Sequence, residues 1–337
     1  MKKAIAIFIV LLMCTVQSVA LCDAHDVSIF DFVNVYETPA TNPSLTDDEL
    51  TALTAAPGDK YETEYATYTL EQLAYDGCNT YMMVSVVPKS DSTLLMSGYM
   101  YEPGDTCFLE DSDVCETFEE KAQRDNSTII ACGVNIDLSD GAICALGSLA
   151  SEKYFADGSM LLELHFAFNE SSEAPREMNV TIEEGEYGTD SAVYSWSLSF
   201  APTASTQTAH SDVNQAATDL VYIDYAELMR SDIGALLCVH GHFADEISES
   251  DLETITSLDF NCEYTDDSIG TISSGLMCYD KHGNEMYIED VTGGESFVFM
   301  CMQSAGTELA DSVNLTINDR SNGETLGEVQ VELTALE

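Results

Sequence analysis

Basic residues are scarce in this chain of 337 residues. It has 11 lysines and arginines against 60 aspartates and glutamates, and its formal net charge is −49 at pH 7. A surface this acidic repels phosphate groups, so the sequence argues against nucleic acid and anionic membrane surfaces as partners. The charge suits either a cationic partner or a solvated surface that keeps the protein in solution.

Motifs of known catalytic chemistry are also missing. The sequence has no nucleophile elbow, no His-Glu-x-x-His metal motif and no glycine-rich phosphate-binding loop. It has no paired, closely spaced cysteines of the kind that hold a structural zinc ion. The many carboxylates do not by themselves indicate a glycosidase, because abundance selects no pair. The sequence therefore predicts a protein that is not an enzyme, with no bound cofactor apart from the calcium considered below.

The chain has one long apolar run, and it lies at the start. Lys2 and Lys3 precede the run, which extends from Ala4 to Val16, and small residues follow at Ser18 and Ala20. This order is typical of a secretory signal peptide, here residues 1–20, and the run is shorter than the ~20 residues that cross a membrane. We expect a secreted, extracellular protein that can be associated with the cell surface; an uncleaved anchor is the alternative.

The second half of the chain repeats the first. Three pairs of similar segments occur in the same order in both halves, which predicts an internal duplication of one domain. The pairs are Leu70–Val87 with Ala226–His242, Ala156–Phe168 with Thr292–Ser304, and Asn179–Ile182 with Asn314–Ile317.

Strand patterns dominate both halves. Short segments rich in β-branched and aromatic residues alternate with Asp-Gly turns, and Tyr194–Phe200 alternates strictly between large aromatic or apolar residues and serine. The predicted fold class is all-β: two tandem immunoglobulin-like β-sandwich domains, about seven strands each. A short N-terminal helix is predicted at Ser44–Leu53, where Thr46 and Glu49 can form a capping box.

The predicted boundaries follow from composition. Residues 21–64 are a lead-in with the short helix, residues 65–200 the first β-sandwich, residues 201–219 a small, polar linker, and residues 220–337 the second β-sandwich. Two acid-rich segments, Tyr99–Asn126 and Ala244–Thr271, break the match between the halves at the same place. We interpret them as loops on the same edge of each domain, where binding residues often lie.

Ten cysteines remain beyond the signal peptide, and two interpretations stay open. Export permits disulfides, and Cys107 and Cys115 are close enough in sequence to form a local bridge. Cys238 and Cys301 lie inside apolar strands, where buried thiols are common. The sequence does not fix the connectivity.

Two groups of residues are candidate metal ligands. Cys238, His240 and His242 alternate along one strand and so share a face, where a thiolate and two imidazoles can bind zinc or copper if a fourth ligand arrives from a neighbouring strand. Asp111 and Asp113 lie in an acid-rich segment that is a candidate for calcium, which prefers several oxygen ligands. The alternatives are surface histidines above a buried cysteine, and a solvated acidic loop.

The segment Tyr65–Gly98 carries a resemblance. It contains a strand, the turn Tyr75-Asp76-Gly77, an apolar strand ending at Pro88, and a polar stretch leading to Leu94-Leu95. Together with the lead-in segment Val27–Asn34, it resembles an uncharacterised all-β domain of exported proteins from gut and rumen Clostridia, related to extracellular domains of Gram-positive sigma-factor regulators. The resemblance implies a bacterial extracellular location and an all-β fold, and it implies no catalytic residues.

These observations lead to one functional hypothesis and two alternatives. We expect a secreted or cell-surface bacterial β-sandwich protein with a non-catalytic binding or structural role, whose partner is an extracellular ligand or protein. The first alternative is a sensory or regulatory module that acts through a membrane partner. The second, less favoured, is a hydrolase of extracellular polymers.

Overall fold

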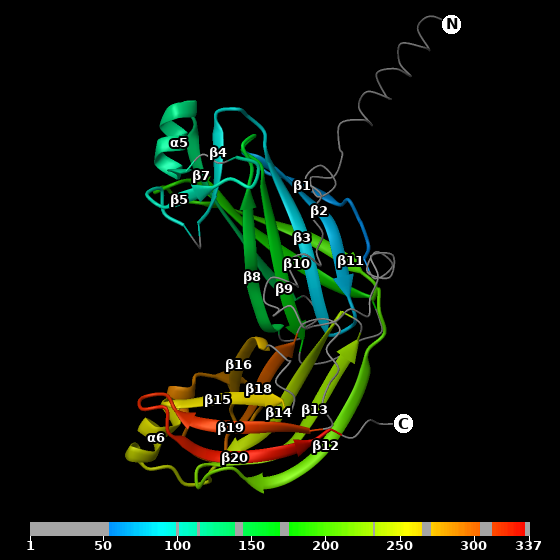
Figure 1. Ribbon diagram of the computed structural model, residues 1–337, viewed down its shortest axis with the longest axis vertical. Coiled ribbons are helices and arrows are strands. Elements are labelled where there is room, and N and C mark those ends of the chain that lie inside the picture. The colour runs from blue at the N-terminus through cyan, green and yellow to red at the C-terminus, as the bar shows by residue number, and fades with distance from the viewer. Residues whose placement is uncertain are drawn as a thin grey trace, which may run out of the picture.

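The computed structural model describes residues 54–98, 101–112, 115–138, 144–168, 175–231, 233–264, 271–303 and 312–333. Strands dominate these residues, which contain two short α-helices, and form two stacked pairs of sheets (Figure 1). The prediction of an all-β fold is confirmed. The signal segment 1–20 and the predicted helix Ser44–Leu53 lie outside the described residues.

The first sandwich packs a sheet of order β1-β2-β3-β9-β8 against a sheet of order β11-β10-β7-β4, with a small β5-β6 hairpin beside them. Neighbouring strands are antiparallel, apart from β4 and β7, which are parallel. The bounds are β1 Lys60–Glu62, β2 Ala66–Tyr75, β3 Asn79–Pro88, β4 Thr93–Ser97, β5 Thr106–Phe108, β6 Cys115–Thr117, β7 Thr128–Leu138, β8 Cys144–Tyr154, β9 Met160–Phe168, β10 Arg176–Glu186 and β11 Ala192–Phe200.

The second sandwich packs a sheet of order β12-β13-β14-β18-β16-β17 against a sheet of order β15-β19-β20. When the edge strands β1, β4, β12 and β17 are left out, the two sandwiches have the same strand order. The order β13-β14-β18-β16 corresponds to β2-β3-β9-β8, and β15-β19-β20 corresponds to β7-β10-β11. The bounds are β12 Gln207–Ala216, β13 Val221–Ser231, β14 Gly234–Phe243, β15 Leu258–Tyr264, β16 Thr271–Tyr279, β17 Glu285–Met286, β18 Ser296–Gln303, β19 Ser312–Asp319 and β20 Thr325–Glu332.

Strand β11 shows how the sequence pattern builds the core. Its side chains alternate between the two faces of the sheet, so Trp196, Leu198 and Phe200 are buried while the serines between them are exposed. Trp196 stacks on Tyr61 with ring centroids 6.2 Å apart. From the alternation in sequence we predict that these three residues and Leu333, near the end of the second sandwich, are buried, and the structure confirms this.

The two acid-rich segments predicted as loops each contain a helix. Helix α5 spans Phe118–Asp125 before β7, and α6 spans Glu249–Thr256 before β15, the corresponding strand of the second sandwich. Both helices begin with a complete capping box, formed by Thr117 with Glu120 and by Ser248 with Asp251. Glutamate and aspartate near a helix N-terminus stabilise it, so acid-rich composition here produced helices where loops were expected.

The predicted linker, residues 201–219, contains strand β12. This edge strand pairs with β13, and its register shifts between Asp212 and Gln215, where Asn214 adopts a left-handed backbone (φ 49°). Most of its side chains are exposed or half-buried, so it lacks the apolar alternation by which strands are found in a sequence.

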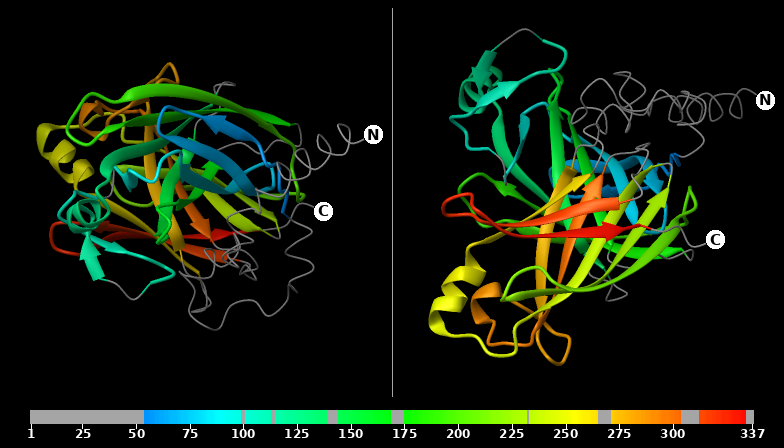
Figure 2. Two further views of the ribbon diagram at one scale, coloured as in Figure 1. Left: turned by 90° about the horizontal axis from the view of Figure 1, so that it is seen from above. Right: turned by 60° about the horizontal axis from the view of Figure 1, so that its bottom comes forward.

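The two sandwiches contact each other through an apolar cluster. Cys78 and Ala167 of the first sandwich pack against side chains on the outer face of the second, chiefly Met229, Cys238 and Met300. Figure 1 shows the lower end of the first sandwich next to the second, and the view from above in Figure 2 shows that the two overlie each other. The contact therefore covers part of the outer face of the sheet that contains β12, β13, β14 and β18, whereas Glu227 on the same face is half-exposed.

A buried carboxylate lies at the edge of this contact. Asp76 accepts hydrogen bonds from the backbone of Cys78 (2.7 Å) and Asn79 (2.5 Å), and from the Ser231 hydroxyl of the second sandwich (2.5 Å). Thr206, between the sandwiches, donates to the backbone carbonyl of Asp76. Burial raises the pKa of Asp76, and these hydrogen bonds partly offset the rise. One turn thus joins both sandwiches and the chain between them.

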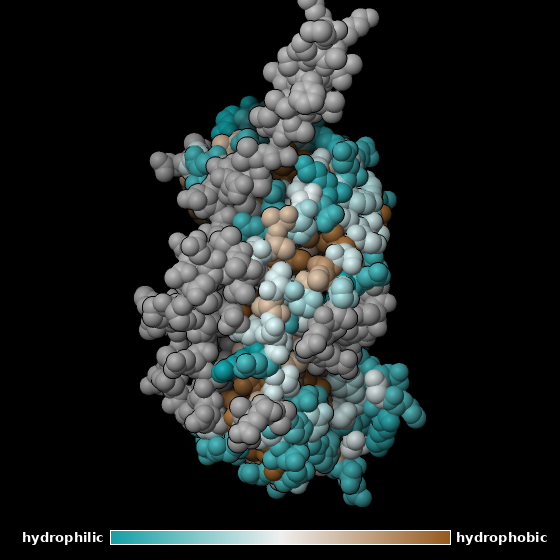
Figure 3. Space-filling model, turned by 90° about the vertical axis from the view of Figure 1, so that its right-hand side faces the viewer, coloured by the Kyte–Doolittle hydropathy of each residue, from teal (hydrophilic) through white to brown (hydrophobic). Residues whose placement is uncertain are grey.

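On the face shown in Figure 3, the described residues near both ends of the two sandwiches are mainly hydrophilic, and apolar residues are visible in patches between them. Among the residues that the structure describes, no helix combines the length and apolar character needed to cross a membrane.

Candidate functional site

Histidine, tyrosine and carboxylate side chains gather on the outer face of β12, β13 and β14. On β14, Leu237 and Val239 point into the core, so Cys238, His240 and His242 lie on the opposite, outer face. The strand pairing places Glu227 of β13 opposite both His210 of β12 and Cys238. The residues of this surface, called here the histidine face, are His210, Asp212, Tyr222, Asp224, Tyr225, Glu227, His240 and His242.

Glu227 lies between two histidines. Its Oε1 is 3.7 Å from Nδ1 of His210, and its Oε2 is 3.7 Å from Nε2 of His240. The other ring nitrogen of His210, Nε2, lies 3.2 Å from Oδ1 of Asp212. One carboxylate is therefore close to two imidazoles from two different strands.

Aromatic rings hold the histidines against the sheet. Tyr225 stacks on His240 with ring centroids 4.2 Å apart and an angle of 11°, and the His210 ring lies 5.2 Å from the same tyrosine. His242 lies 5.0 Å from Tyr222, and its Nδ1 is 3.0 Å from Oδ2 of Asp224. Stacking on a rigid sheet restricts the rotamers of these side chains, so the surface is ordered before any ligand arrives.

Burial controls the charge of the central residues. Desolvation lowers the pKa of His240, and the nearby carboxylates of Glu227 and Asp224 offset part of that decrease. Desolvation is also the main cause of a raised pKa at Tyr225, with Glu227 and Asp224 adding to it. His240 and Tyr225 are thus held neutral at neutral pH.

The predicted ligands Cys238, His240 and His242 share a face but are not brought together around one point. Alternate residues of a strand are ~7 Å apart, too far for three of them to bind one ion directly. Burial in the apolar contact raises the pKa of Cys238 to about 12, which disfavours the thiolate that metals require. Across the described ranges, no group of three or more histidine, cysteine, aspartate or glutamate residues is placed to hold a metal ion.

Of the two predicted calcium ligands, Asp111 and Asp113, the structure describes only Asp111. Oδ1 of Asp111 accepts a hydrogen bond from the backbone of Ala156 (2.8 Å), so this carboxylate anchors the turn between β8 and β9. Asp113 lies outside the described residues.

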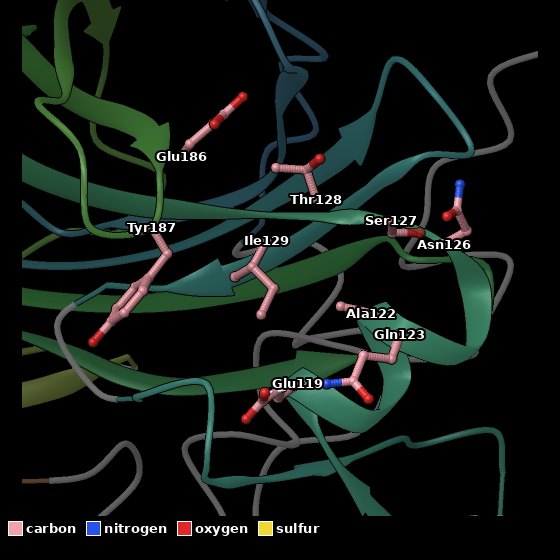
Figure 4. A pocket seen from close by; sticks show the side chains of 9 residues that line it. All are labelled: Glu119, Ala122, Gln123, Asn126, Ser127, Thr128, Ile129, Glu186 and Tyr187. Atoms are coloured by element: carbon pink, nitrogen blue, oxygen red, sulfur yellow. Dashed lines mark hydrogen bonds between the residues drawn. The ribbon is translucent and has the colours of Figure 1, made fainter.

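A hollow of ≈700 Å³ lies beside α5, at the far end of the first sandwich. Figure 4 shows Ile129 pointing towards Glu119 and Gln123 of helix α5, with Tyr187 on the opposite side of the space. Its lining contains no histidine or cysteine. The hollow is therefore lined mainly by polar side chains, with Ala122 and Ile129 among them, and offers less varied chemistry than the histidine face.

The corresponding outer face of the first sandwich is also polar, but it is buried. His165 stacks on Tyr81 with centroids 3.9 Å apart, Lys153 Nζ lies 3.0 Å from Glu163 Oε1, and the Ser85 hydroxyl donates to Glu71 (2.5 Å). Burial lowers the pKa of His165 to about 3. This face, called here the buried polar face, holds its groups in fixed pairs.

Sequence reasoning found the histidines of β14 but missed their partners on β12 and β13. A bulge in β13 between Ile223 and Tyr225 makes Asp224 an extra residue and shifts the alternation. In the sequence of Tyr222–Glu227, inward-facing and outward-facing residues therefore do not alternate regularly. The available signal was composition: three of the chain's six histidines and several tyrosines and acids fall within Ala209–Phe243.

Comparisons with known proteins assign no family. No protein-family model matches the chain, and no curated protein matches it. Among solved structures, the chain is similar to a crystal structure of a conserved domain protein from Bacillus anthracis, with 9% identity, 83% of this chain and 92% of that chain covered, and a TM-score of 0.46. A structure titled BspA_C_WT has 8% identity, covers 78% of this chain and 96% of that chain, and has a TM-score of 0.19. Cadherin-like domains 1 to 4 of zebrafish RET have 9% identity, cover 76% and 57%, and have a TM-score of 0.16.

Proposed function

We propose that the chain is a secreted or cell-surface bacterial protein with a non-catalytic binding role, built from two immunoglobulin-like sandwiches that arose by duplication. The shared strand order supports the duplication. In each sandwich, seven strands follow the constant-type immunoglobulin arrangement, four in one sheet and three in the other. The helix before the third of these strands, α5 or α6, occurs at the same place in both.

The observation that carries the binding role is the half-exposed histidine face. Its carboxylates, Glu227 and Asp224, lie beside stacked tyrosine and histidine rings, and this combination recognises a cation through charge and through the ring faces. The strongly acidic chain attracts cations over a longer range. The partner proposed here is therefore a basic segment of an extracellular protein.

Binding to a defined cationic peptide tests this function. An octa-arginine peptide and a neutral Gly-Ser peptide of equal length are compared by surface plasmon resonance on immobilised protein. The double variant Asp224→Asn/Glu227→Gln is expected to bind octa-arginine at least ~tenfold more weakly, a change of about 1.4 kcal/mol. The matched control, Glu328→Gln/Glu332→Gln, removes two exposed charges from β20. Equal weakening in both variants would show that only net charge matters and would contradict the proposal.

A further inference from the structure

Two cysteines face each other across the core of the second sandwich. Cys262 lies on β15, in the sheet β15-β19-β20, and Cys301 lies on β18, in the opposite sheet. Cys301 is buried, and Cys262 packs against the same core cluster. The two thiols therefore belong to different walls of one core.

The aromatic residues beside them fix this arrangement. Phe260 stacks on Phe299 across the core, with ring centroids 5.5 Å apart. Side chains on one face of a strand recur every second residue, so Cys262 and Cys301 are each the next inward position after this stacked pair. The Cys262 thiol is hydrogen-bonded to that of Cys301, which together with burial raises the pKa of Cys262 well above its ordinary value.

Cys107 and Cys115, for which the sequence left a local bridge open, do not have this geometry. In the β5–β6 hairpin Cys107 pairs with Glu116 and Cys115 pairs with Phe108, so the two cysteines point to opposite faces. Cys107 is buried in the core of the first sandwich, whereas Cys115 is exposed. A bridge between them would require the hairpin to rearrange.

We propose that Cys262 and Cys301 are a covalent modification site: they form a disulfide that joins the two sheets of the second sandwich when the chain folds in the presence of a disulfide oxidant. To form the bond, the two sulfur atoms need to approach to about 2.05 Å. This inference does not depend on the histidine face or on the proposed partner.

The chemistry is thiol–disulfide exchange with an oxidant such as glutathione disulfide. One cysteine thiolate attacks the oxidant and forms a mixed disulfide, releasing the first glutathione thiolate. The second cysteine thiolate attacks the protein sulfur of that mixed disulfide and releases the other. Two electrons pass from the protein sulfurs to glutathione, and the two protons end on the released thiols. Because Cys301 is buried, we expect the reaction before the core closes.

Peptide mapping tests the bridge directly. The full chain is reduced, denatured and refolded either in a glutathione redox buffer or with reduced glutathione alone, then alkylated in denaturant and mapped without reduction. We expect a peptide that links Cys262 to Cys301 only after oxidative refolding, and an intact mass, measured before alkylation, that is lower by two hydrogen atoms. The proposal would be overturned if both cysteines of the wild-type chain were found alkylated after oxidative refolding, or if either one were linked to another cysteine.

Two variants sharpen the assignment. Cys262→Ser is expected to abolish the link and to leave Cys301 open to alkylation, whereas Cys278→Ser removes another buried cysteine of the same sandwich and should leave the link intact. Oxidised wild-type protein should unfold several degrees above its reduced form. That difference should vanish in Cys262→Ser and persist in Cys278→Ser. If either variant fails to fold, the wild-type map still decides the question.

Discussion

The outer faces of the two sandwiches contain related groups in opposite environments. On the first, His165, Tyr81 and Glu163 are buried, and Lys153, which pairs with Glu163, is half-buried. On the second, the stacked pair His240–Tyr225 is half-buried, and Glu227 remains accessible. Each face also has a bulged strand whose extra residue is acidic, Glu71 in β2 and Asp224 in β13.

This difference in burial suits the groups of the first sandwich to a structural role and those of the second to a binding role. A buried charge that loses its partner costs several kcal/mol, so the groups of the buried polar face are fixed by the fold. Groups at a half-exposed surface can exchange a water molecule or a weak partner for a ligand at little cost. The comparison therefore predicts large stability effects on the first sandwich and small ones on the second.

The largest effect is expected from pH. Because burial lowers the pKa of His165 to about 3, the unfolded chain, with a histidine pKa of ~6.5, takes up this proton at higher pH than the folded chain does. The stabilisation is complete above pH ~6.5 and is lost as pH falls towards 3, by as much as ~5 kcal/mol. Urea unfolding of wild type and His165→Gln at several pH values measures it.

The difference between the two curves isolates His165 from other groups. Asp76 and Glu152 have pKa values raised by burial, so they contribute stability in their protonated forms and act in the opposite direction as pH falls. A wild-type curve parallel to that of His165→Gln between pH 3 and 6.5 would show that the histidine is not buried as described.

The second largest effect is expected when the buried Glu163 loses the ammonium group with which it pairs. Lys153→Met leaves the Glu163 carboxylate, whose side chain is 2% exposed, without its ammonium group, and should cost ~3–5 kcal/mol in the free energy of unfolding. The double variant Lys153→Met/Glu163→Gln should recover much of this loss. A cost below ~1 kcal/mol for the single variant would place the pair among ordinary surface ion pairs.

A smaller effect on the free energy of unfolding is expected at the contact between the sandwiches. Ser231→Ala removes a hydrogen bond to the buried Asp76 and should cost ~1.5–3 kcal/mol, as expected for a bond to a charged group. Denaturant unfolding measures the loss, and Ser199→Ala on the exposed face of β11 is the control, with a change within ~0.5 kcal/mol. A similar result for both serines would contradict the role given to Asp76.

The smallest effect is expected on the histidine face. Glu227→Gln removes a carboxylate that raises the pKa of His240, so this pKa should fall further, as measured by NMR titration of the imidazole protons. The free energy of unfolding should change by less than ~1 kcal/mol. A stability loss as large as that of Lys153→Met would remove the distinction between the two faces.

The sequence predicted the central strands because their burial follows their alternation. In β11, Trp196 and Leu198 mark the core face without knowledge of any neighbour. Edge strand β12 was missed because it buries little. Helices α5 and α6 were missed although the capping residues Thr117 and Ser248 are visible, because acid-rich composition favoured the interpretation as loops.

The site was predicted in part for a similar reason. Alternation along one strand was enough to place His240 and His242 on one face. The partners depend on pairing between strands, and the bulge at Asp224 moves that pairing by one residue. The Cys262–Cys301 contact depends on how two sheets pack, which no local pattern contains.

The bulge in β12 bears on how the protein behaves at high concentration. An unpaired edge strand offers backbone groups to which a second chain can add its own strand, a common start of aggregation. Here the edge is interrupted between Asp212 and Gln215, Asn214 turns the backbone away from extended geometry, and its carbonyl accepts a hydrogen bond from Tyr222. An incoming strand cannot stay in register across this interruption, and the charge of Asp212 opposes its approach, so this edge protects the sheet against growth into fibrils.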